Sequence, residues 1–107
     1  MSNSLLNWIG NWYKNNCDGD WEHSYGITIE TTDNPGWHIT IDLINTNLCN
    51  EFIEYSLVEN NASDWYGIKV ENAKFIASGD DSKLELLLLE FQKFVEARAN
   101  KQINRTP

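Results

Sequence analysis

Hydrophobic residues near the amino terminus recur every three or four positions, which is the pattern of an amphipathic helix. They are Leu5, Leu6, Ile9, Trp12 and Tyr13. The serines at positions 2 to 4 provide a cap for the start of this helix, and Gly19 with the polar residues around it ends it. We therefore expect a helix over residues 4–16.

A second helical pattern occupies the carboxy-terminal part of the chain. Asp80, Asp81 and Ser82 provide caps and acidic residues that favour a helix start, so we expect a helix over residues 82–99. Its buried stripe consists of Leu84, Leu87, Leu88, Phe91, Phe94 and Val95. Leu86 and Leu89 lie off this stripe, and they either pack on the first helix or form a dimer contact.

Between the two helices the hydrophobic pattern changes to alternation, which predicts half-buried strands. The alternating stretches are residues 25–30, 37–44, 52–59 and 65–71, with a shorter one at 74–77. Pro35 and Gly36 suit the central positions of a type II turn between the first two strands. If Ile29 and Ile41 share a face, that loop has an odd length or a bulge intervenes.

These elements predict an α+β fold. Adjacent strands with short links suggest an antiparallel meander of four to five strands, with both helices on one face. Residues 1–107 form one domain, and about 100–107 form a loose polar tail. The other face is expected to be polar, acidic and uncovered, and carries Thr28, Glu30, His38, Thr40, Asp42, Glu54 and Ser56.

Charge changes this picture because it is unevenly distributed. The net charge is −8, but residues 1–68 hold ten acids and one base, Lys14, whereas residues 69–107 hold six acids and seven bases. Such a field repels nucleic acid and anionic lipid and attracts cationic partners to the amino-terminal part. A general role in solubility is the alternative.

The sequence favours a cytoplasmic location. Met1 to Lys14 lacks the features of a secretory signal, and the longest apolar run, Leu86 to Leu89, is too short to span a bilayer. Two cysteines without secretory context indicate reduced thiols. We expect no membrane association and no nucleic-acid ligand.

The segment CDGDWEH, from Cys17 to His23, brings together a thiol, three carboxylates, an indole and an imidazole, the side chains most suited to catalysis or metal binding. A thiol enzyme would use Cys17 as nucleophile and His23 as base. The end of a helix and three nearby carboxylates disfavour the thiolate, however. A calcium loop would need Gly at the position of His23 and Glu at that of Ile29. The four His and Cys residues show no zinc spacing, so we expect no cofactor or metal.

The same segment carries a family resemblance. CDGDWEHSYGITIETTDNPGWHITIDL follows a first helix that contains Trp8 and Trp12. This order resembles the immunity protein 53 family of bacterial polymorphic toxin systems, and the close likeness covers about Trp12 to Thr46. One departure is Thr32, where the family more often has a bulky apolar residue. The resemblance implies a small α+β protein that binds a toxin and protects the producing cell, without catalytic residues.

Several residues of this motif have two interpretations. Trp21 is either a lid over the edge of the sheet or an exposed anchor for a partner. Trp37 is expected in the core, and His23 and His38 are expected to be hydrogen-bonded structural groups. The candidate partner-binding residues are Asp18, Asp20, Trp21, Glu22, Glu30 and Asp42, because the acids lack an evident cationic partner within the chain.

Two classes of function follow from these observations. The first is an immunity protein, a monomer or weak homodimer, whose acidic surface captures a cationic protein toxin such as a basic nuclease. The second is a small enzyme or metal-binding protein that uses the segment from Cys17 to His23. Unpaired acids on an open face favour the first, and a buried pocket around His23 would favour the second.

Overall fold

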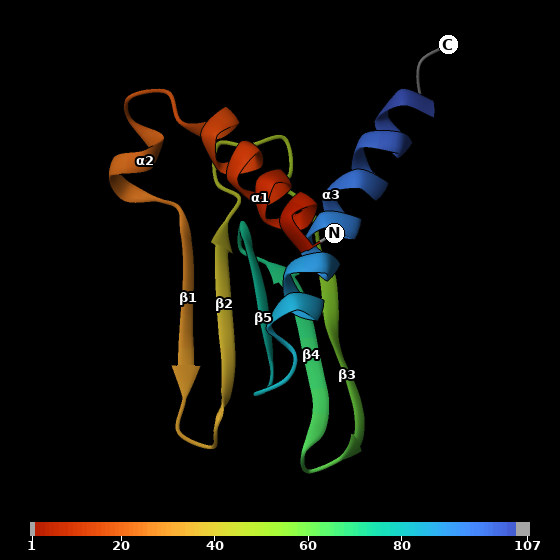
Figure 1. Cartoon of the computed structure of the whole chain (residues 1–107). Coiled ribbons are helices and arrows are strands. Elements are labelled where there is room, and N and C mark those ends of the chain that lie inside the picture. Colours follow the sequence, from red (N-terminus) through yellow and green to blue (C-terminus); the bar gives the residue numbers. More distant parts are fainter. Residues whose placement is uncertain (1, 105–107) are drawn as a thin grey trace.

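The protein consists of one antiparallel sheet with two long helices on one of its faces (Figure 1). A computed structural model describes the backbone of residues 2–104 and the side chains of residues 4–99. The elements are α1 (Ser2–Asn16), α2 (Trp21–Ser24), β1 (Ile27–Thr32), β2 (Gly36–Asp42), β3 (Ile53–Asn61), β4 (Asp64–Glu71), β5 (Lys74–Asp80) and α3 (Leu84–Asn104). The predicted α+β class, the antiparallel sheet and the helix at each end are confirmed.

Most element boundaries differ from the predicted ones by one or two residues, and three differences are larger. The short helix α2 was not predicted, and β5 is three residues longer than the alternating stretch suggested. Helix α3 continues to Asn104, so it includes most of the segment expected as a polar tail. Residues 105–107 lie outside the described part of the chain.

The β1–β2 hairpin has a loop of odd length, as expected if Ile29 and Ile41 share a face. Thr32 pairs with Gly36 and Ile29 pairs with Ile39, so the loop between the strands has the odd length of three residues. The predicted type II turn is wrong, because Gly36 is a strand residue and lacks the positive φ that this turn requires. Gly36 is needed for a different reason, since a Cβ there would lie 2.5 Å from the carbonyl oxygen of Gly79 on β5.

The strand order is β1-β2-β5-β4-β3, which differs from the expected meander. Consecutive strands pair within β3, β4 and β5, but β2 pairs with β5 and not with β3. The connection over residues 43–52 therefore carries the chain from β2 to the far edge of the sheet. Leu43 and Leu48 in this connection are buried and fix it to the core. Strand β3, with its glutamates and asparagines, occupies the edge, where polar residues are tolerated.

The core lies between the sheet and the two helices. It contains Leu5 and Ile9 of α1, Ile39, Ile41, Leu43 and Leu48, Val70, Phe75 and Ala77, and Leu87, Leu88, Phe91 and Phe94 of α3. The centroid of the Phe91 ring lies 4.9 Å from that of Trp12 and 5.1 Å from that of Phe75, so α1, α3 and β5 meet at Phe91. The predicted stripe of α3 is confirmed, with Leu84 and Val95 at its half-buried margins.

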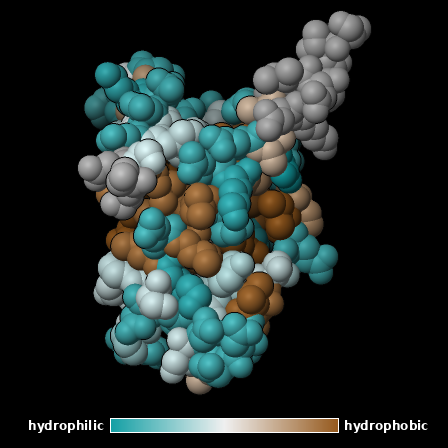
Figure 2. All heavy atoms as spheres, turned by 45° about the vertical axis from the view of Figure 1, so that its right-hand side comes forward, coloured by the Kyte–Doolittle hydropathy of each residue, from teal (hydrophilic) through white to brown (hydrophobic). Residues whose placement is uncertain are grey.

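Figure 2 shows hydrophobic residues in a band across the middle of one face, with hydrophilic residues at both ends of the molecule. Leu86 packs against the core, whereas Leu6 is 58% exposed and Leu89 is 38% exposed. Over residues 2–104, no helix combines the length and the apolar character that crossing a bilayer requires.

A buried carboxylate links the end of β5 to its neighbours. Asp80 is only 3% exposed. Its carboxylate accepts hydrogen bonds from the Trp65 amide on β4, from the amide and hydroxyl of Ser82, and from the Lys83 ammonium group at 2.7 Å. Asp80 therefore caps the turn before α3, as the sequence predicted. It also joins β5 to β4 through Trp65 and to the residues before α3 through Lys83.

Candidate partner-binding surface

The loop before α2 is organised by two of the predicted acids. The Asp18 carboxylate accepts hydrogen bonds from the amides of Asp20 and Trp21 at 2.9 and 3.0 Å. The Glu22 carboxylate accepts from the amides of Asp18 and Gly19 at 3.0 and 2.9 Å. Gly19, at φ 98°, supplies the left-handed turn between them. These carboxylates therefore stabilise the loop and keep their charge at its surface.

Backbone amides explain the acidity of both groups. The amide of Trp21, followed by that of Asp20, holds the pKa of Asp18 below its ordinary value. The pKa of Glu22 is also lowered, by its own amide first and then by the amides of Asp18 and Gly19. Both side chains are consequently anionic at neutral pH.

Trp21 is a buried residue and not an exposed anchor. It is 4% exposed, and its indole N–H donates a hydrogen bond to the carbonyl oxygen of Ile44 at 2.9 Å. Its ring centroid lies 6.2 Å from Trp12, 6.0 Å from Tyr13 and 6.4 Å from Tyr25. Trp21 thus attaches α2 to α1 and to the loop after β2, so the proposed anchor role is wrong.

The other reactive side chains of the segment CDGDWEH are those of Cys17 and His23. The Cys17 thiol donates a hydrogen bond to the carbonyl oxygen of Tyr13 at 3.3 Å, one turn earlier in α1. His23 is exposed, and neither Cys17 nor His23 lines the hollow between α3 and the β3–β4 pair, the one between α1 and β1, or the one between α1 and α3. Among the described residues, no group of three or more His, Cys, Asp and Glu side chains is placed to hold a metal ion.

The open face of the sheet carries a row of polar residues on β1, β2 and β5. Glu30 lies opposite His38, and His38 lies opposite Ser78. The His38 Nδ1 atom is 2.7 Å from the Ser78 hydroxyl oxygen, so His38 is a hydrogen-bonded group as expected. Glu30 is exposed at the β1 edge of this row. The row places one acid at the surface beside His38 and Ser78.

Two residues expected on this face behave differently. Asp42 has a cationic partner, because its Oδ1 atom lies 3.2 Å from the Lys74 ammonium nitrogen and its Oδ2 atom accepts from the Gly26 amide. Ser56 lies on the helix-facing side, opposite Ile68. The pairing of β3 with β4 shifts between Ile53 and Ser56, and such a shift reverses which side chains face the core.

Ion pairing divides the charged residues into two groups. The pairs are Lys69–Glu71, Lys74–Asp42, Lys83–Asp64, Lys83–Asp80, Lys93–Glu90 and Arg98–Glu51. Within the side chains of residues 4–99, every base except Lys14 takes part in one. Asp18, Asp20, Glu22 and Glu30 take part in none. Six further acids, Asp33, Glu54, Glu59, Asp81, Glu85 and Glu96, also take part in none. The four acids of the loop before α2, of α2 and of β1 lie in a stretch, residues 15–68, that holds no Lys or Arg.

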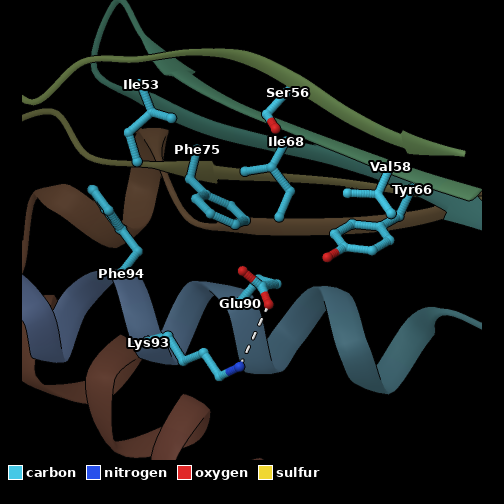
Figure 3. A pocket seen from close by; sticks show the side chains of 9 residues that line it. All are labelled: Ile53, Ser56, Val58, Tyr66, Ile68, Phe75, Glu90, Lys93 and Phe94. Carbon is cyan, nitrogen blue, oxygen red and sulfur yellow. Dashed lines mark ion pairs between the residues drawn. The ribbon is translucent and has the colours of Figure 1, made fainter.

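The sequence did not reveal two hollows beside the helices. One, of about 310 Å³, lies between α3 and the β3–β4 pair. Figure 3 shows Phe94 near one end of it and Val58 near the other, with Glu90, which pairs with Lys93 at 3.7 Å, between them. The other lies between α1 and β1 and includes Tyr13 and Tyr25. Such hollows depend on how far a helix extends across the sheet, which hydrophobic periodicity does not specify.

Comparison with known families gives one match. A family model described as Immunity protein 53 matches residues 6–96, from α1 well into α3. No curated protein and no solved structure matches the chain.

Proposed function

The chain belongs to the immunity protein 53 family, and from this premise we propose that it neutralises a cationic toxin by binding it at the acidic surface of α2 and β1. Family membership implies an immunity protein. The location of the contact and the charge of the partner are our inferences from the arrangement of charges. The contact residues are Asp18, Asp20, Glu22 and Glu30, with Asp42 contributing through its pair with Lys74.

The observation that carries this proposal is a group of four unpaired acids, Asp18, Asp20, Glu22 and Glu30, in a part of the chain that holds no Lys or Arg. Each described base from Lys69 onward pairs with an acid, whereas these four acids pair with none and lie in a stretch, residues 15–68, without Lys or Arg. Like charges held close together repel one another and slightly destabilise the free protein. A cationic surface that binds there removes this repulsion. Complementary charge also accelerates the encounter and disfavours wrong partners.

A binding role agrees better with this loop than catalysis does. The carboxylates of Asp18 and Glu22 are already engaged by backbone amides, and the Cys17 thiol is directed to a carbonyl oxygen. A catalytic acid or nucleophile requires a pocket in which a substrate can reach it. The loop instead presents the exposed side chains of Asp18 and Asp20 to solvent.

The proposed partner is a protein toxin with a basic surface, for which a nuclease domain is a natural example because it binds a polyanion. The immunity protein would act in the cytoplasm of the producing cell, as a monomer or weak homodimer. A charge of −8 opposes self-association at low ionic strength and favours a partner of opposite sign.

The test uses the toxin domain encoded beside this gene and measures its association and dissociation rates at two salt concentrations. We expect Asp20→Lys and Glu30→Lys to lower the association rate and its dependence on salt. A truncated acid at the centre of the contact should accelerate dissociation and cost about 2–5 kcal/mol. Lys93→Gln and Glu96→Gln on α3 are the matched controls.

The proposal fails if the parent protein does not bind that toxin domain. The location fails separately if the Asp20 and Glu30 variants bind like the parent while the substitutions on α3 abolish binding. In that case the contact surface would lie on the carboxy-terminal helix.

A further inference from the structure

A hollow of about 420 Å³ separates the last turns of α1 from the start of β1. It is lined by Ile9, Gly10, Tyr13, Tyr25, Gly26 and Ile27. The two tyrosines are 38% and 36% exposed, so their rings are accessible from solvent. Both rings pack on Trp21 of α2. The hollow is therefore next to α2, which carries the unpaired Glu22 and follows the loop with Asp18 and Asp20.

Four of the six glycines of the chain have an evident role in the fold. Gly19 has a φ of 98°, which side chains rarely adopt. An added Cβ would collide with the Gly79 carbonyl at Gly36 and with the Tyr55 ring at Gly67. At Gly79 it would collide with the Lys83 side chain. The conformation or the packing of the protein requires glycine at these positions.

The other two glycines have no such role, and both line this hollow. A Cβ at Gly10 would meet no atom within 4 Å beyond its own helix, although glycine inside a helix is less stable than alanine. A Cβ at Gly26 would make only an ordinary contact, 3.8 Å from Cε1 of Tyr13. Neither residue is in a positive-φ conformation. Their common effect is to keep the hollow open.

We propose that this hollow receives an arginine or lysine side chain of the toxin, an inference that rests on the proposed function. The aliphatic part of such a side chain would lie against Ile9 and Ile27. Its cationic end would lie over the faces of Tyr13 and Tyr25, where the aromatic quadrupole attracts a cation. A neutral apolar side chain would fill the same space but would gain nothing from the acids.

The charges around the hollow support a cationic occupant. Asp18, Asp20 and Glu22 belong to the same loop and helix as Trp21, on which both tyrosines pack. Lys14 follows Tyr13 in α1, but it does not line the hollow. The acids provide long-range attraction, and the tyrosines provide a defined place for one side chain.

The first test needs no toxin and uses argininamide as the probe. In an NMR titration of the whole protein, we expect the amide signals of Gly10 and Gly26 to shift with argininamide. The shifts should be much smaller with norleucinamide, which has a similar stem without the guanidinium group. They should disappear in Gly10→Trp, whose indole fills the hollow. Equal shifts in the parent and in Gly10→Trp would overturn the proposal.

The second test measures the affinity of the toxin domain encoded beside this gene. Gly10→Trp should raise Kd by about tenfold or more, since it excludes the side chain. Gly10→Ala is the matched control, and we expect a higher melting temperature with nearly unchanged affinity. Tyr25→Ala should raise Kd roughly 2- to 30-fold, and Tyr25→Phe should retain most of the affinity because it keeps the ring.

The outcomes separate this inference from the proposed function. If the parent and the Gly10→Trp variant bind the toxin domain equally while Asp20→Lys weakens binding, the acidic surface is correct and the hollow is not used. If the parent does not bind the toxin domain, the proposed function fails, and the argininamide titration still decides whether the hollow accepts a guanidinium group.

Discussion

Single residues around α2 combine structural and electrostatic roles. Asp18 and Glu22 satisfy backbone amides in a loop that would otherwise leave them unpaired. Asp20 makes no comparable side-chain contact among the described hydrogen bonds and is exposed. Substitution of Asp20 therefore tests charge alone, whereas substitution of Asp18 or Glu22 also disturbs the loop.

Trp21 should contribute strongly to stability. Trp21→Ala removes a buried indole and its hydrogen bond to Ile44, and we expect a loss of about 3–5 kcal/mol in the free energy of unfolding. Trp21→Phe should lose less, because the ring contacts with Trp12 and Tyr13 are kept in part. Urea denaturation measures both, with Leu89→Ala as an exposed control. A small effect of Trp21→Ala would contradict this account of α2.

Cys17 should be dispensable for protection. In Cys17→Ser the hydroxyl can donate to the Tyr13 carbonyl oxygen as the thiol does. We expect an unchanged circular dichroism spectrum and full protection of cells that produce the toxin. Loss of protection by a folded Cys17→Ser protein would instead indicate thiol chemistry and favour an enzyme.

At the scale of elements, the β4–β5 hairpin holds an unfavourable residue. Glu71 pairs with Lys74, and the two residues between them, Asn72 and Ala73, have φ values of 55° and 59°. Asparagine tolerates this left-handed conformation, but alanine does so at a cost. Ala73→Gly should therefore raise the free energy of unfolding by up to about 1 kcal/mol, measured by urea denaturation. Gly26→Ala is the control. Because φ at Gly26 is not positive, alanine there should not lower the free energy of unfolding through a left-handed conformation.

Local periodicity predicted the elements better than their arrangement. The alternation in β1 and β2 specified both the facing side chains and the odd loop length, because a strand has a period of two. The same rule failed in β3, where the register shift after Ile53 turned Ser56 toward the helices. A shift of this kind leaves no mark in the hydrophobic pattern.

The strand order explains the other differences between sequence and structure. Asp42 was expected to be unpaired, and its partner Lys74 lies 32 positions later on β5. The Asp42–Lys74 ion pair becomes evident only when β5 is placed beside β2. The short links between strands had suggested β3 as the neighbour of β2. Trp21 was ambiguous for a similar reason, because the carbonyl group that binds its indole belongs to a loop 23 positions later.

At the scale of the whole molecule, the Asp80 cluster predicts how stability depends on pH. The Lys83 ammonium group, followed by Ser82, lowers the pKa of Asp80 far below its ordinary 3.8, and Lys83 also lowers that of Asp64. These contributions are present above about pH 4 and are lost as the pH falls through the lowered pKa values. Asp64 and Asp80 raise the pKa of Lys83 above 10.5, so its contribution is lost only as the pH rises beyond that value.

We therefore expect a broad plateau of stability around neutral pH and a decline on the acid side. Thermal unfolding measured from pH 2 to pH 8 should show it. Asp80→Asn should be less stable at neutral pH and should lose less stability on acidification. Glu71→Gln, in a half-exposed ion pair with Lys69, is the control and should follow the parent. An unchanged acid limb in Asp80→Asn would contradict this role of the cluster.

The position of β5 at the centre of the sheet also determines when the protein can become active during its synthesis. Strand β5 is the last to be made, yet it alone joins the β1–β2 hairpin to the β3–β4 pair. Until residues 74–80 leave the ribosome, the nascent chain holds two hairpins that have no common partner, and α3 follows later still. The proposed toxin-binding surface on α2 and β1 is therefore expected to rest on a complete sheet only after residues 74–80 have been made.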